Sequence, residues 1–231
     1  MLNQKDKLKS HFKSNGYVVI ENAITKEQCN EVMSNVKDLV KNNELNMVSF
    51  GDSNFKTING EKLLKLIPET EILYDKFMLL ASDISGEKLV KINNSKIGIS
   101  LNLTTEGDSF QFHYDRNLIT VVAYINEVKG GQMLLSPRAR LFSNNNPQRK
   151  IYSKFISLLE IIKTKLAESS LIKKVGINPN PGKAIIFEGR ETLHKVEKVE
   201  KGYDRISIQF AYDLDANLFS PASTKDYYGN N

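Results

Sequence analysis

The apolar positions in the N-terminal part of the chain recur mainly at helical spacing. Leu8 and Phe12 stand four residues apart among lysines, which predicts a short amphipathic helix over residues 5–13. Residues 16–24, GYVVIENAI, predict a strand, and residues 69–82 carry apolar side chains along one helical face. We therefore expect helices to dominate this part of the chain.

A capping-box pattern marks the start of the first long helix. Thr25 is followed three residues later by Gln28, so each side chain can satisfy a free backbone N–H of the other. Apolar positions then continue at helical spacing, at Cys29, Val32, Met33, Val36, Leu39 and Val40. Residues 43–62 are rich in Asn and Gly and predict a long loop that covers a pocket, or else a flexible connector.

The pattern changes at residue 96 to short apolar runs bounded by turn residues, which is typical of strands. Residues 147–171 interrupt these runs with apolar side chains at helical spacing, and the polar residues 143–146 predict a loop. Helices followed by many short strands predict an α+β fold with a β-sandwich or jelly-roll core.

The length of 231 residues suits one well-buried domain. Within that domain we expect helical support from residues 1–95, a jelly-roll core in residues 96–213, and a tail in residues 214–231.

Composition narrows the chemistry and the compartment. The single cysteine, Cys29, can form neither an internal disulfide nor a Cys-based metal site, which favours a cytoplasmic protein whose metal ligands are His and carboxylate. No apolar run approaches the roughly 20 residues that span a bilayer, so we expect no membrane association. The net charge is +5, but the lysines are scattered, which favours a solvated surface over a nucleic-acid site and suits an anionic small-molecule partner.

Two of the three histidines accompany a carboxylate in a suggestive order. His113 and Asp115 are two residues apart, so a strand that continues through both places them on one face. His194 follows Asp115 by 79 residues, at the start of another apolar run. Two His and one carboxylate would leave three positions open on one side of an octahedral Fe(II), where a 2-oxo acid and O2 can bind together. Incidental histidines on strands are the alternative.

Arg205 strengthens this interpretation. It follows His194 by eleven residues and begins the run RISIQFAYD, where its guanidinium could bind the distal carboxylate of 2-oxoglutarate. Ser207 alternates onto the same face and could donate to the same carboxylate. A surface ion pair between Arg205 and Asp204 or Glu197 is the alternative.

With these residues the sequence resembles the Fe(II)/2-oxoglutarate-dependent oxygenase superfamily. The signature is H-x-D, a distal His and an Arg about ten residues later, and it is present as His113, Asp115, His194 and Arg205. The resemblance implies a double-stranded β-helix, Fe(II) held by the first three residues, and 2-oxoglutarate held by Arg205. Residues 96–213 look closest to enzymes that hydroxylate or halogenate free amino acids, while the N-terminal GYVVIENAI is similar to phytanoyl-CoA-dioxygenase-like members.

Three further positions refine the resemblance. Asn102 matches an Asn that contacts the co-substrate in nucleic-acid demethylases of the superfamily, although it could equally support the turn at Gly107. Halogenating relatives replace the carboxylate by a small residue, so Asp115 favours hydroxylation. The demethylases carry a second Arg six residues after the first, where this chain has Ala211, which argues against base repair.

We therefore expect a dioxygenase that hydroxylates a small polar substrate, with release of succinate and CO2. A free amino acid is the substrate class that the resemblance implies, and Arg140 and Arg190 are candidate partners for its carboxylate. The alternatives are an oxygenase acting on protein or nucleic acid, and a jelly-roll binding protein without enzymatic activity.

Overall fold

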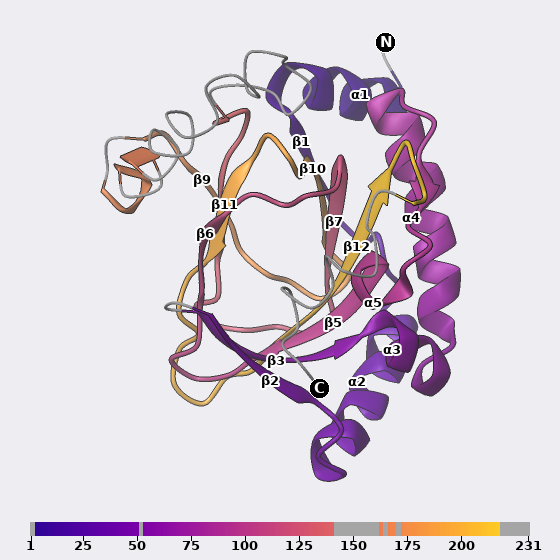
Figure 1. The fold of residues 1–231 in the computed structure, drawn as a ribbon, viewed down its shortest axis with the longest axis vertical. Coiled ribbons are helices and arrows are strands. Elements are labelled where there is room, and N and C mark those ends of the chain that lie inside the picture. Colours follow the sequence, from indigo (N-terminus) through magenta and orange to yellow (C-terminus); the bar gives the residue numbers. More distant parts are fainter. Residues whose placement is uncertain (1–2, 51–52, 141–161, 164–165, 170–171, 218–231) are drawn as a thin grey trace.

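The computed structural model describes residues 3–50, 53–140, 162–163, 166–169 and 172–217. These residues form two antiparallel sheets, and helices cover one side of the larger sheet while the smaller sheet lies on its other side (Figure 1). The expected combination of helices and antiparallel strands is confirmed.

The helices lie mostly in the N-terminal half of the chain. They are α1 (Gln4–Asn15), α2 (Lys26–Lys41), α3 (Gly60–Leu66), α4 (Glu69–Ser85) and α5 (Ser95–Gly98). The capping box at the start of α2 is formed by Thr25 and Gln28 as predicted. Of the predicted helix over residues 147–171, residues 162–163 and 166–168 are helical, while most of that segment and the predicted loop at 143–146 lie outside the described residues.

The larger sheet has the strand order β1-β10-β7-β12-β5-β3-β2, with β4 paired to β12. Its strands are β1 (Tyr17–Ile20), β2 (Asn46–Phe50), β3 (Ser53–Asn59), β4 (Val90–Lys91), β5 (Ile99–Thr104), β7 (Ile119–Tyr124), β10 (Ala184–Glu188) and β12 (Arg205–Asp213). The smaller sheet has the order β6-β11-β8-β9. It consists of β6 (Phe110–His113), β8 (Met133–Ser136), β9 (Val175–Ile177) and β11 (Leu193–Val196).

The residues of strand β12 alternate between the two faces of the larger sheet. Its even-numbered residues, from Ile206 to Tyr212, belong to the main hydrophobic core, which also contains buried side chains of α1 to α4. Its odd-numbered residues, beginning with Arg205 and Ser207, therefore face the smaller sheet, because successive strand residues point to opposite faces. A second apolar cluster fills part of the space between the sheets and includes Tyr124, Leu135 and Phe187.

Two predictions about local structure are wrong. Residues 43–62 do not form a long loop, because they contain the paired strands β2 and β3 and the start of α3. Strand β6 ends at His113, so side-chain alternation along a continuous strand is not what places Asp115. In both segments tertiary hydrogen bonds decide the backbone conformation, and a local pattern does not contain them.

No helix among the described residues is long and apolar enough to cross a membrane.

Candidate metal centre

Two histidines and one carboxylate meet at the edge between the two sheets. His113 on β6 and His194 on β11 are direct partners in antiparallel register, and their ring centroids lie 4.2 Å apart. The Asp115 Oδ1 atom lies 3.6 Å from the Nε2 atom of each imidazole. One ligand atom from each of the three residues fits within a span of 4.8 Å, so the group could hold one metal ion.

A backbone contact from the residue after β10 and a side-chain contact from β7 place Asp115. Its N–H donates to the carbonyl of Gly189 at 3.1 Å, and its Oδ2 atom accepts from the Thr120 hydroxyl at 2.5 Å. A Cβ atom on Gly189 would lie 2.6 Å from the Thr120 Oγ1 atom and 3.1 Å from the Asp115 Cβ atom. Only glycine therefore allows this close approach, and Oδ1 is left to face the histidines.

Backbone carbonyls orient both imidazole rings. The Nδ1 atom of His113 lies 2.9 Å from the carbonyl oxygen of Gln111, and that of His194 lies 3.0 Å from the carbonyl oxygen of Thr192. Because a carbonyl oxygen only accepts, each Nδ1 must carry the hydrogen, which leaves the Nε2 lone pair of each ring pointing at Asp115. This arrangement is common around metal-binding histidines.

The electrostatics of the three residues suit a cation. Burial lowers the pKa of His194 to about 4, with a further decrease from His113, and Asp115 opposes both effects. His194 is therefore neutral near pH 7, which is the form that binds metal. The Asp115 Oδ1 atom is buried and has no hydrogen-bond partner among the described residues, an arrangement that costs free energy unless a cation is present. The donor set of two imidazoles and a carboxylate fits Fe(II) with open coordination positions.

A buried cation lies at the start of β12. Arg205 is 2% exposed, and its Nη1 atom donates to the Ser207 hydroxyl at 3.0 Å. Its guanidinium lies 5.0 Å from the ring centroid of Tyr124, and its Nε atom has no hydrogen-bond partner among the described residues. The predicted alternative of a surface ion pair does not fit this burial, and an anionic ligand would satisfy the guanidinium.

Asn102 and Ser207 lie in one row across the larger sheet. Asn102 on β5 pairs in register with Ser207 on β12 and with Thr57 on β3, while Ser207 pairs with Tyr124 on β7. The Thr57 hydroxyl donates to the Asn102 Oδ1 atom at 2.8 Å, so Asn102 does not serve the turn at Gly107. Ser207, two residues after Arg205 on β12, and its register partner Asn102 therefore lie on the same face of the larger sheet as Arg205.

Tyr124 and Thr104 lie beside Arg205 and were not predicted as site residues. Thr104 is the register partner of Arg205, and its hydroxyl is buried without a hydrogen-bond partner among the described residues. Burial raises the pKa of Tyr124, while Arg205 opposes that shift, so the phenol is protonated and can donate. Side-chain alternation in residues 119–124 indicates which face of the strand Tyr124 occupies. The strands that lie beside it depend on register, which the local sequence does not contain.

The two arginines predicted to bind substrate are both held by protein groups. Arg190 forms an ion pair with Asp213, and its Nε atom donates to the carbonyl of Arg116 at 2.7 Å. The guanidinium of Arg140 lies 4.4 Å from the ring centroid of Tyr114. Tyr114 packs with an apolar cluster around Phe112, on the side of β6 away from His113.

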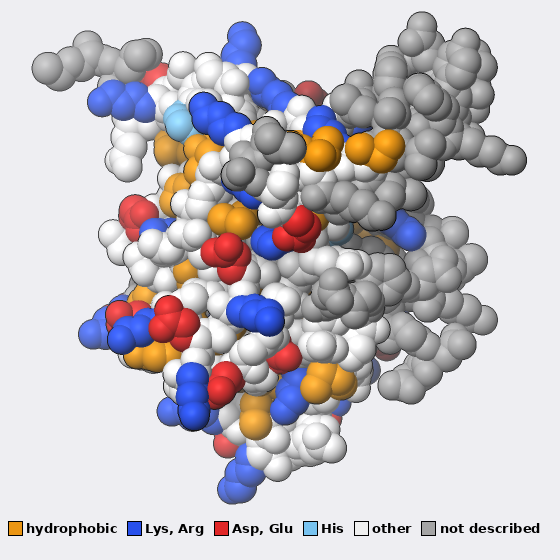
Figure 2. Space-filling model, turned by 90° about the vertical axis from the view of Figure 1, so that its left-hand side faces the viewer, with side chains coloured by type: hydrophobic (Ala, Val, Ile, Leu, Met, Phe, Trp, Pro, Cys, Tyr) orange, Lys and Arg blue, Asp and Glu red, His pale blue; other side chains and the backbone are white. Residues whose placement is uncertain are grey.

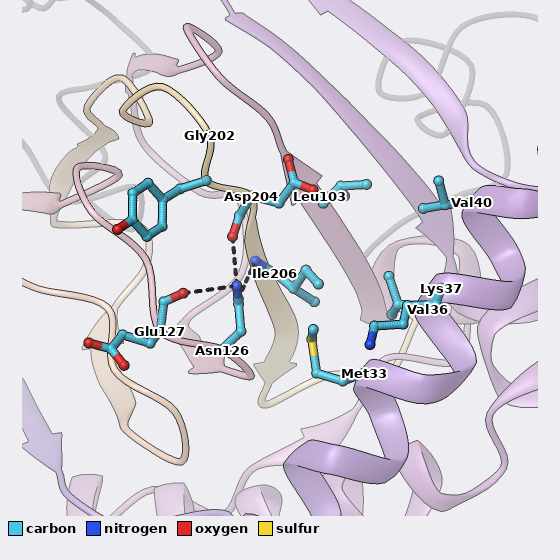
Figure 3. A pocket seen from close by; sticks show the side chains of 11 residues that line it. Met33, Val36, Lys37, Val40, Leu103, Asn126, Glu127, Gly202, Asp204 and Ile206 are labelled. Atoms are coloured by element: carbon cyan, nitrogen blue, oxygen red, sulfur yellow. Dashed lines mark hydrogen bonds between the residues drawn. The ribbon is translucent and has the colours of Figure 1, made fainter.

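A separate groove of about 410 Å³ lies on the other face of the larger sheet (Figure 3). Side chains of α2, including Met33 and Val36, line one wall, and Leu103 and Ile206 line the sheet side. Asn126 closes one end by donating to the carbonyl of Asp204 at 2.6 Å. None of the metal-centre residues lines this groove, so we assign it no part in the chemistry of the triad.

Part of the sequence also matches a model of a known family. A family model described as the 2OG-Fe(II) oxygenase superfamily matches residues 99–213, about half of the chain, and this segment contains the triad and Arg205. A search of curated protein sequences found no match.

Solved structures show the same fold at low sequence identity. The non-heme alpha ketoglutarate dependent epimerase SnoN from nogalamycin biosynthesis aligns with a TM-score of 0.67 at 14% identity, covering 90% of this chain and 80% of its own. The carbocyclase SnoK from the same biosynthesis gives 0.68 at 12% identity, covering 99% and 93%. A prolyl hydroxylase from Trichoplax adhaerens, in complex with a peptide fragment of hypoxia inducible factor, gives 0.64 at 18%, covering 90% and 88%.

Proposed function

The chain belongs to the 2OG-Fe(II) oxygenase superfamily, and on that premise we propose that it is a hydroxylase of a small polar substrate. In the proposed reaction 2-oxoglutarate, O2 and a substrate C–H bond give succinate, CO2 and the hydroxylated product. One oxygen atom of O2 enters succinate and the other enters the product. The observation that carries this proposal is the buried, unsatisfied Asp115 Oδ1 atom facing two oriented histidines.

In this proposal His113, Asp115 and His194 bind Fe(II), which supplies the oxidising chemistry together with O2 and 2-oxoglutarate. The protein fixes the Nε2 atoms through two backbone carbonyls and fixes the carboxylate through Thr120. Since these contacts exist in the protein alone, the ligands need little rearrangement to bind the metal.

Arg205 is the proposed partner of the distal carboxylate of 2-oxoglutarate. The guanidinium is buried, and no carboxylate of the described residues forms an ion pair with it. Ser207 and Tyr124 flank it with hydroxyl groups, and Asn102, the register partner of Ser207, continues the polar row on β5. We assign Asn102 and Ser207 to the co-substrate on this basis.

The two sheets are the proposed faces of a double-stranded β-helix, or jelly roll, within a single domain over residues 1–231. Residues 1–95 would support the core over residues 96–213, and residues 214–231 would form a tail. The hairpin of β2 and β3 is a candidate cover for the pocket. It reaches the smaller sheet through stacked rings of Phe55 and Phe110, with centroids 4.0 Å apart.

A free amino acid is the substrate class that the sequence resemblance implies, with Arg140 and Arg190 at its carboxylate. In that form of the proposal Arg190 must exchange its bond to Asp213, and Arg140 must leave Tyr114. The N-terminal strand, which is similar to phytanoyl-CoA-dioxygenase-like members, contains none of the proposed site residues.

A peptide substrate is the second candidate, because a prolyl hydroxylase in complex with a peptide fragment shares the fold. A nucleic-acid substrate has less support. On the face shown in Figure 2, Lys and Arg side chains are interspersed with Asp and Glu. Several lysines are also in ion pairs, such as Lys5 and Lys9 with Asp83.

Anaerobic titration of the metal-free protein with Fe(II) and then 2-oxoglutarate tests the cofactor sites directly. We expect a weak visible charge-transfer band from the chelate, lost in His194→Ala and retained in His11→Ala. His11 is an exposed residue of α1 and provides a matched control for removal of an imidazole. Absence of the band in the wild type would favour a binding protein without enzymatic activity.

A further inference from the structure

The space between the two sheets has an apolar half and a polar half. Met133, Leu135, Ile177, Ile185 and Phe187 fill the side formed by β8, β9 and β10. The opposite side, formed by β3, β5 and β12, carries uncharged polar residues in register, at Thr57, Asn102, Ser207, Ser100 and Gln209. A substrate that enters from the polar side would therefore contact amide and hydroxyl groups.

Two glutamines, one on each sheet, are partly exposed. Gln209 is the one residue of β12 that is not fully buried, and strand alternation places it on the same face as Arg205 and Ser207. Gln111 is also partly exposed and lies two residues before His113 on β6, so it shares the face of that metal ligand.

Neither side-chain carboxamide has a hydrogen-bond partner among the described residues. Among the described residues the side chains of Gln111 and Gln209 make no hydrogen bond, although Gln28 and Gln132 each make one. The backbone carbonyl of Gln111 is already engaged by the His113 ring, which fixes this residue beside the metal centre. Gln209 lies between Ser207 and Ala211, and Ala211 is the register partner of Thr120, which holds Asp115.

Arg205 and the two arginines considered for a substrate carboxylate are already engaged. Arg205 is committed to the co-substrate in the proposed function, Arg190 is paired with Asp213, and Arg140 stacks on Tyr114. A glutamine side chain offers a substrate carboxylate hydrogen-bond donors but no positive charge to offset its desolvation. A carboxamide side chain both donates and accepts, which suits an uncharged partner that does the same.

We propose that Gln111 and Gln209 contact the substrate and select a neutral group with hydrogen-bond donors and acceptors, a hydroxyl or a carboxamide, at the reacting end. This selection rests on the proposed function and narrows its substrate class, away from free amino acids and toward neutral polar molecules. The two glutamines then determine specificity, while the triad and Arg205 serve every substrate alike.

Pairs of similar probes, one neutral and one carrying a carboxylate, test the selection. Succinate release by the Fe(II)-loaded protein with 2-oxoglutarate and O2 is measured with methyl glucoside against glucuronate, and with N-acetyl amino-acid amides against the corresponding N-acetyl amino acids. Release with at least one neutral member should exceed release with its carboxylate partner by about tenfold, the effect of roughly one well-made hydrogen bond. Equal or greater release with the carboxylate members would overturn the inference, as would no response to any neutral member while the chelate band forms.

Substitution of each glutamine tests whether it contributes to the preference for neutral substrates. Gln111→Leu and Gln209→Leu should each raise the KM for the active neutral probe by about 3–10-fold and leave the Kd of 2-oxoglutarate unchanged. Gln132→Leu is the matched control, because Gln132 bonds Asn178 on the apolar side of the small sheet. An increase in the Kd of 2-oxoglutarate, with the probe's KM unchanged, would assign the glutamine to the co-substrate instead. Loss of the chelate band in the wild type would contradict the proposed function itself, so the two failures are distinguishable.

Discussion

Arg190 and Asp213 form an ion pair in which the side chains are 13% and 4% exposed. Asp213 ends β12 and also accepts the N–H of Leu118, while Arg190 donates to the carbonyl of Arg116. The pair therefore ties the end of β12 to the loop that follows Asp115. Arg190 also follows Gly189, whose carbonyl accepts the Asp115 N–H, so the pair helps to fix the backbone that positions Asp115.

Arg190→Met should destabilise the protein strongly. The substitution leaves the Asp213 carboxylate buried with only backbone N–H donors, and breaking such a pair by removing one partner costs about 3–5 kcal/mol. Urea unfolding measures the change in the free energy of unfolding. Arg138→Met is the matched control, because Arg138 pairs with Glu188 at 45% side-chain exposure and its loss should cost about 1 kcal/mol or less. Similar losses from the two substitutions would show that the Arg190 pair has no special role.

Thr120→Val should weaken Fe(II) binding without unfolding the protein. Valine keeps the shape of threonine but removes the hydroxyl that holds the Asp115 Oδ2 atom, and loss of such supporting contacts lowers metal affinity by about 10–100-fold. Anaerobic Fe(II) titration at saturating 2-oxoglutarate measures the affinity. Thr70→Val offers the same substitution at a buried site on α4, where the hydroxyl donates to the carbonyl of Ile67, and should leave Fe(II) affinity unchanged. Wild-type affinity in Thr120→Val would show that the carboxylate is placed by its backbone alone.

The predictions from sequence succeed where the signal is local. The capping box of Thr25 and Gln28 and the alternation along β12 each lie within a few residues, and the structure contains both. The grouping of His113, Asp115 and His194 was also predicted, although the reason given for Asp115 was wrong, since β6 ends before it. The roles assigned to these residues stay predictions until the titrations are done.

The missed features depend on contacts between distant segments. The strand β3 carries few strongly apolar residues, and its pairing with β5 through Thr57 and Asn102 is a property of register. The row that joins Asn102 to Ser207 and Tyr124 is likewise visible only once three strands are aligned. Arg190 has the chemistry of a substrate-binding residue, and only the position of Asp213 shows that the fold already uses it.

Gly131→Ala should impair binding of 2-oxoglutarate while sparing the metal. Gly131 has a φ of 60°, and a Cβ atom there would lie 2.9 Å from the Arg205 Cδ atom, so the guanidinium must shift. We expect the Kd of 2-oxoglutarate to rise about tenfold, the loss of roughly one charge-assisted hydrogen bond, with Fe(II) affinity unchanged. Anaerobic isothermal titration gives both values: Fe(II) is titrated into the metal-free protein, and 2-oxoglutarate into the Fe(II)-loaded protein.

Gly86→Ala is the control that distinguishes the contact with Arg205 from backbone strain as the cause of weaker 2-oxoglutarate binding. Gly86 has a φ of 80°, and a Cβ atom there would have no neighbour within 4 Å among the described residues. Its replacement should cost about 1–2 kcal/mol of stability, as at Gly131, without changing the Kd of 2-oxoglutarate. An equal rise in that Kd for both variants would attribute the effect to general destabilisation.

Arg205→Lys should retain the charge and lose most of the affinity for 2-oxoglutarate. Lysine places a single ammonium where the guanidinium offers two parallel donors, and it cannot bond the Ser207 hydroxyl and a carboxylate in the same planar geometry. We expect the Kd of 2-oxoglutarate to rise roughly 10–100-fold, from the loss of one charge-assisted hydrogen bond. Fe(II) should bind as in the wild type, because Arg205 does not contact the triad. Arg138→Lys, at the exposed pair with Glu188, should change neither value. A wild-type Kd in Arg205→Lys would mean that another cation holds the distal carboxylate. That result would contradict the assignment of Arg205 to 2-oxoglutarate.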